Sequence, residues 1–264
     1  MRQFTPYLFL LLAASFLYSC KSAKLSDAEE KQRIGEYFEA AAIYRKVYTK
    51  TPPAKRDLRG YIAFRMAECN RLINNTPRAT SAYMNALRYK YPDSIVNLRL
   101  GQMYQKSGRY GEAVKYYNDY LLAEPGSVLA FNGVTGCEEA VKWKQSPTRY
   151  TVKRMDKFNS RRSEFSPMLY GEKYDQLYFA STRTPKGAGK DKEETNSAIT
   201  GQRNNDLFLV KQDENGAWLA PVELEEEVNT EFDEGTPSFS KDGNTMYYTY
   251  CAQDPEGPRT SEIY

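Results

Sequence analysis

The sequence predicts a multidomain protein in which a helical repeat domain is followed by a β-sheet domain. Two observations lead to this fold class. Between Gly60 and Gly126 the chain matches itself at an offset of about 34 residues, a period typical of a two-helix unit. After Trp143 the helical periodicity fades, and short alternating runs separated by turn residues replace it. A third observation, an apolar segment that ends at Cys20, places a targeting segment ahead of both domains.

The targeting segment covers residues 1–19. A basic residue precedes an apolar run over residues 7–18, which is shorter than the roughly 20 residues that a transmembrane helix needs. The stretch Leu17-x-Ser19-Cys20 resembles the lipobox of bacterial lipoproteins, in which the chain is cut before a cysteine that is then acylated. This resemblance implies a membrane anchor, because two or more acyl chains hold a protein stably at a bilayer. There are two alternatives. One is an ordinary signal peptide with an incidental cysteine, and the other is a transmembrane helix.

Composition excludes several classes of function. The formal net charge of +3, without a basic tract, argues against a nucleic-acid partner. Histidine is absent, which removes the usual general base of hydrolases and the commonest metal ligand. Cys69, Cys137 and Cys251 lack metal-binding spacing and are expected to be small buried apolar residues. We therefore expect no catalytic residue, no metal and no cofactor, which is the pattern of a non-enzyme.

The helical domain is predicted over residues 20–143. It is expected to contain three repeats, at 21–54, 58–92 and 94–127, and a capping helix near 128–142. Small residues let the two helices of a pair approach closely, and large ones fill the space beside them. In the last repeat these packing positions are Leu100, Gly101, Tyr104, Ala113, Tyr117 and Pro125. The pattern resembles the tetratricopeptide repeat (TPR), which implies an α-solenoid.

A TPR solenoid implies a concave face that is lined by the first helix of each pair. Such a polar groove usually binds an extended peptide or a partner helix. The residues expected to be exposed on it are Arg65, Asn70, Asn97, Gln102 and Gln105. The alternative is that the repeats only space and orient the second domain.

The second domain is predicted over residues 144–264. Two of its segments resemble each other, SEFSPMLYGEKYDQLYFAST from Ser163 and DEGTPSFSKDGNTMYYTYC from Asp233. Each contains an acidic residue, a proline, a short strand, a turn and an aromatic strand. Strands are also expected near 205–210 and 216–222. Four strands followed by a restart are typical of one blade of a β-propeller.

The second copy carries a more specific motif. Pro237-Ser-Phe239-Ser240-Lys-Asp242-Gly243 resembles the PD40, or TolB-type, repeat, which implies a WD40-like β-propeller. The propeller would be incomplete, because one and a half blades cannot close a ring and would leave an exposed edge. We therefore expect the natural protein to continue beyond Tyr264.

Two polar segments interrupt the predicted strands. The insert at 184–204 is expected to be a solvated loop, with a binding loop as the alternative. The acidic run at 223–234 is expected to be a solvated connection, because its carboxylates lack the spacing of a known calcium loop.

The order of lipobox, TPR and PD40 propeller resembles the N-terminal part of PorE-type, OmpA-family lipoproteins of Bacteroidetes. The resemblance implies a scaffold at the periplasmic face of the outer membrane, associated with type IX secretion. Its partners would be outer-membrane lipid through acylated Cys20, other envelope proteins through the TPR and propeller, and peptidoglycan through an OmpA-like domain absent from this chain. Two alternatives stay open. One is a lipoprotein for nutrient (glycan) uptake, and the other is the N-terminal part of a propeller-gated hydrolase.

Overall fold

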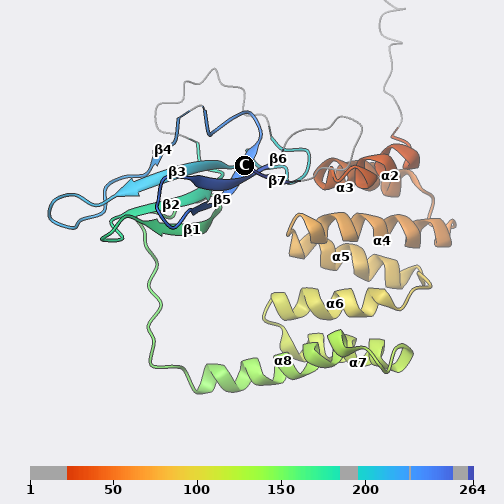
Figure 1. Cartoon of the computed structure of the whole chain (residues 1–264). Helices are drawn as coiled ribbons and strands as arrows, with labels where there is room; N and C mark the ends of the chain where they lie inside the picture. The colour runs from red at the N-terminus through yellow and green to blue at the C-terminus, as the bar shows by residue number, and fades with distance from the viewer. Residues whose placement is uncertain (1–22, 185–195, 226, 252–260) are drawn as a thin grey trace, which may run out of the picture.

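The computed structural model describes residues 23–184, 196–225, 227–251 and 261–264, in which seven helices precede seven strands (Figure 1). Cys20 and the targeting segment lie outside the described residues. Within those residues, no helix combines the length and the apolar character needed to cross a bilayer. The helices are α2 (Leu25–Arg33), α3 (Tyr37–Lys50), α4 (Arg56–Leu72), α5 (Thr76–Arg88), α6 (Ile95–Lys106), α7 (Tyr110–Ala123) and α8 (Val128–Gln145).

The helices form a stack in which each helix packs against the next one in the chain, and α8 also contacts α6. The pairs α2/α3 and α6/α7 fall inside the first and third repeat ranges expected from the sequence, and α4/α5 matches the second except that α4 begins two residues earlier, at Arg56. The helix α8 follows as the expected cap and ends at Gln145. Alanines at matching positions of the second helices, Ala40, Ala79 and Ala113, are fully buried and allow close approach. Tyrosines four residues later fill the space beside them, namely Tyr44, Tyr83 and Tyr117.

The strands form two antiparallel sheets with the orders β1-β2-β3-β4 and β5-β6-β7. In the first sheet, aromatic and aliphatic side chains from β2 and β3 form the core together with Phe158. The strands are β1 (Glu164–Tyr170), β2 (Gln176–Ser181), β3 (Asp206–Lys211), β4 (Val222–Glu223), β5 (Asp233–Phe239), β6 (Met246–Cys251) and β7 (Glu262–Ile263).

The two sheets begin in the same way, as the sequence similarity predicts. The pairing of β1 with β2 shifts register between Phe165 and Met168, and the pairing of β5 with β6 shifts at the matching place. At these bulges Ser166 and Thr236 have positive φ angles of 51° and 45°. A proline follows each of them and cannot donate to the ladder, so the bulge accommodates it.

A loop of the β part lies against the start of α3. The amide of Phe38 lies 3.1 Å from the carbonyl oxygens of both Ala198 and Ile199, and donates to them. These carbonyls satisfy N-terminal helix donors that Glu36, the residue before α3, does not cap with its side chain. Gly201, at φ +72°, faces the Phe38 ring, and a Cβ there would lie 2.3 Å from a ring carbon.

The contact with α3 corrects the expectation of a solvated insert over residues 184–204. Residues 185–195 lie outside the described residues, whereas Ala198, Ile199 and Gly201 contact the start of α3. The acidic run at 223–234 also differs from expectation, because Glu234 is 1% exposed. The Asn229 side chain, 9% exposed, bonds to both the amide and the carbonyl of Leu207, at 2.7 and 3.0 Å.

Candidate functional site

The five polar residues expected on the first helices do not form one exposed set. Asn70 is 4% exposed, because its side-chain amide turns back along α4 and donates to the Met66 carbonyl at 2.8 Å. The expectation that Asn70 is exposed was therefore wrong. The other four residues are partly exposed. Gln105 accepts a bond from the Tyr117 hydroxyl at 2.6 Å, and Gln102 accepts one from Arg99 at 3.1 Å.

The packing positions expected in the last repeat have mixed environments. Leu100, Gly101, Tyr104, Ala113 and Tyr117 are buried in the stack. Pro125 is exposed, in the turn between α7 and α8. Two of the three cysteines expected to be buried, Cys69 and Cys137, are buried, while Cys251 is partly exposed.

Three charged side chains on the first helices α4 and α6 form one cluster around Glu68. Glu68 lies 2.6 Å from the Arg71 guanidinium and 3.2 Å from that of Arg99, and it accepts a bond from the Tyr83 hydroxyl. Burial acts to raise the pKa of Glu68, but the bonds from Arg71 and Tyr83 outweigh it and hold that pKa below its ordinary value. Each charged group of this cluster already has a partner inside the stack, so the cluster is part of the internal structure.

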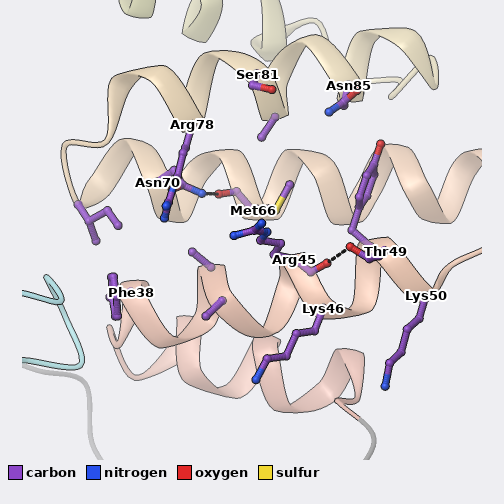
Figure 2. Close-up of a pocket in the computed structure, with 15 residues that line it drawn as sticks. Phe38, Arg45, Lys46, Thr49, Lys50, Met66, Asn70, Arg78, Ser81 and Asn85 are labelled. Carbon is purple, nitrogen blue, oxygen red and sulfur yellow. Dashed lines mark hydrogen bonds between the residues drawn. The ribbon is translucent and has the colours of Figure 1, made fainter.

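A groove of ≈ 820 Å³ runs between α3 and α5, with α4 behind it (Figure 2). Most of its apolar residues are buried or partly buried, whereas Phe38, Ala42 and the cations are exposed. We define the α3–α5 groove by the apolar residues Ala41, Met66, Ile73 and Ala82, the cations Arg45, Lys46, Lys50 and Arg78, and Phe38 at one end.

The cations of the α3–α5 groove have no internal counter-charge. The residues that line the groove include no aspartate or glutamate. Across the part of the chain that the structure describes, the ion pairs involve none of Arg45, Lys46, Lys50 and Arg78. The groove is therefore a recess of positive potential with an apolar floor.

The four cations of the groove, which the repeat pattern does not identify, share one feature of the sequence. Arg45, Lys46, Lys50 and Arg78 have no carboxylate three or four residues away on their helices. Many other cations of the stack do have one, as in the Arg33–Glu30 and Arg109–Glu112 pairs. Arg56, Arg88 and Lys106 also lack such a carboxylate, so this feature alone does not single out the groove.

In the β part, two matching carboxylates lie in opposite environments. Glu164 accepts bonds from Ser160 and from Arg183, the latter at 3.0 Å, and these bonds lower its pKa although burial acts against them. Glu234 accepts from Thr230, but its Oε2 is buried without a hydrogen-bond partner among the described residues. Burial raises the pKa of Glu234 to about 7. The described residues hold no group of three or more cysteines and carboxylates arranged to bind a metal ion.

We expect Glu234→Gln to raise the free energy of unfolding at pH 8 by on the order of 1–2 kcal/mol. Because the folded-state pKa is raised to about 7, the native Glu234 holds a proton that the unfolded chain releases at lower pH. Stability is therefore full below the unfolded pKa and falls as the pH rises toward 7. Denaturant unfolding at pH 5 and pH 8 should show a pH-dependent loss in the wild type that shrinks in the variant.

Glu164→Gln is the matched control, with the opposite sign. Its lowered pKa means that the ionised form stabilises the fold above the unfolded pKa, so the variant should lose stability at pH 8. Equal effects of the two substitutions would contradict the different environments of these carboxylates.

No protein-family model and no curated protein sequence matches this chain. Among solved structures, it is similar to the C-terminal TPR-containing domain of a Plasmodium falciparum FK506-binding protein, with 17% identity and a TM-score of 0.40 over 50% of this chain and 98% of that one. It is also similar to the Sgt2 TPR domain of Aspergillus fumigatus, with 16% identity and a TM-score of 0.40 over 54% of this chain and 93% of that one. A third similar structure is that of the MamA protein, with 16% identity and a TM-score of 0.29 over 48% of this chain and 94% of that one.

Proposed function

We propose that this protein is a non-enzymatic docking scaffold, held at a membrane by lipid on Cys20, that binds other proteins through its helix stack. The observation that carries this proposal is the α3–α5 groove, an open recess whose cations have no counter-charge among the described residues. A surface of this kind leaves positive charge and apolar area for a partner to cover. The helices hold the recess in place, because their buried alanines and tyrosines fix the spacing of the stack.

The finer proposal is a lipoprotein of the outer membrane, on its periplasmic face, that serves type IX secretion. The order of the sequence motifs supports it: a lipobox at 17–20, TPR positions within 20–143 and the PD40-type motif within 144–264. The proposal includes contact with peptidoglycan through an OmpA-like domain.

The β part of the same proposal is the first portion of a β-propeller. A four-stranded antiparallel meander followed by a restart supports this proposal, as do the matching bulges at Ser166 and Thr236. In the scaffold, the propeller would present a second docking surface beside the helices.

The substitution Cys20→Ala tests the anchor. We expect it to move the protein from the membrane fraction to the soluble fraction of cells, because each acyl CH₂ that leaves the bilayer removes about 0.8 kcal/mol of membrane affinity. Ser22→Ala, two residues away, is the matched control and should leave the protein in the membrane fraction. Unchanged membrane retention of Cys20→Ala would contradict the lipid anchor.

A further inference from the structure

We propose that the α3–α5 groove binds an acidic, extended peptide segment of a protein partner; this inference rests on the docking function proposed above. Its first support is charge. Four cations, Arg45, Lys46, Lys50 and Arg78, line one recess without an acidic residue among its lining. Carboxylates of a partner would meet these cations without first displacing an internal ion pair, in contrast to the Glu68 cluster on α4.

The second support is the length of the groove. Its α3 side runs from Phe38 to Lys50, and at ~1.5 Å per residue this is about 18 Å along the helix axis. An extended chain advances ~3.3 Å per residue, so about five residues fit along it. Phe38 marks one end of the groove (Figure 2). The loop with Gly201 packs against the Phe38 ring there.

The third support is the arrangement of apolar and charged groups. Among the residues that line the recess, Met66 is partly buried and Ala82 is buried, whereas the cations are exposed. Side chains of an extended peptide alternate between two faces, so a sequence that alternates acidic and aliphatic residues can satisfy both. Arg45 and Arg78 add a preference for carboxylates, because a guanidinium can bind one through two parallel hydrogen bonds.

A recess favours a peptide over a membrane surface. Anionic lipid headgroups form a broad plane, which contacts protruding cations but leaves the apolar residues of a recess uncovered. Only a narrow chain reaches Met66, on α4, while its carboxylates remain beside the cations. A membrane is therefore an outcome that the experiment must distinguish.

The test is fluorescence anisotropy with the full chain and a labelled peptide of about eight alternating glutamate and leucine residues. We expect saturable binding, which Arg45→Glu combined with Arg78→Glu weakens by about tenfold or more. Both arginines are exposed, so the fold should persist, and circular dichroism checks this. Lys115→Glu with Lys144→Glu makes the same charge change at exposed positions outside the groove and should leave binding unchanged.

Three outcomes would overturn the inference. One is equal binding of a peptide with glutamine in place of glutamate, and another is full binding by the double arginine variant. The third is binding of phosphatidylglycerol vesicles, but not of the peptide, by the Cys20→Ala full chain in a manner that depends on Arg45 and Arg78. None of these outcomes would contradict the docking function itself. That function is tested separately, by membrane retention and by cross-linking to envelope proteins, and neither measurement uses the acidic peptide.

Discussion

Replacing Glu68 with alanine is expected to lower the free energy of unfolding by about 3–5 kcal/mol. The Glu68 carboxylate is mostly buried. It forms ion pairs with Arg71 and Arg99 and accepts a hydrogen bond from the Tyr83 hydroxyl. Without it, the polar groups of Arg71 on α4, Tyr83 on α5 and Arg99 on α6 stay partly buried but lose their shared acceptor, which costs their desolvation free energy. Denaturant unfolding followed by circular dichroism measures the loss.

The control for this prediction is Glu112→Ala. Glu112 also pairs with an arginine, Arg109, but both side chains are about half exposed, so water replaces the lost contact and Tm should change little. Because the folded-state pKa of Glu68 is lowered, its contribution is present above the unfolded pKa and is lost as pH falls through the folded pKa. Similar Tm changes for Glu68→Ala and Glu112→Ala would contradict a structural role for the Glu68 cluster.

Gly101→Leu is expected to cost about 3 kcal/mol, at the upper end of what overpacking usually costs. Tyr117 lies between two glycines on different helices, Gly101 of α6 and Gly133 of α8. A Cβ at these positions would lie 2.6 and 2.5 Å from atoms of the tyrosine ring. The ring is 2% exposed, and because protein interiors are closely packed, it can move aside only by displacing its neighbours. The strain should appear as a lower Tm and as weaker docking of α8.

Gly111→Leu is the matched control on α7. A Cβ at Gly111 would meet nothing within 4 Å, so the substitution should be neutral or stabilising, by up to about 1 kcal/mol, through helix propensity. The same change in stability for Gly101→Leu and Gly111→Leu would contradict the close packing of Tyr117 between α6 and α8.

The helical half could be predicted from sequence because its packing faces repeat. Ala79 and Ala113, with Tyr83 and Tyr117, mark the inward side of successive second helices, and the helix pairs lie where these positions predict. The paired strands of the β part could be predicted from turn residues and alternation. Closure of a propeller ring depends on further strands and therefore stays a proposal.

The groove and the exceptions could not be predicted in the same way. The α3–α5 groove forms where Arg45 and Arg78, from different helices, face a common recess, and the repeat pattern describes only inward positions. Asn70 was misjudged because its amide satisfies a carbonyl of its own helix. Glu234 was misjudged because an acidic run suggests solvent, whereas its last residue is a strand residue buried between sheets.

The most direct test of the docking function is photo-cross-linking in the native envelope. A photoreactive residue at Ser81, in the α3–α5 groove, is compared with one at Lys115, outside it. A scaffold predicts a specific protein adduct from position 81 that is weak at position 115 and is lost when Arg45 and Arg78 are changed to glutamate. No adduct from position 81, or the same adducts from both positions, would contradict a docking site in this groove.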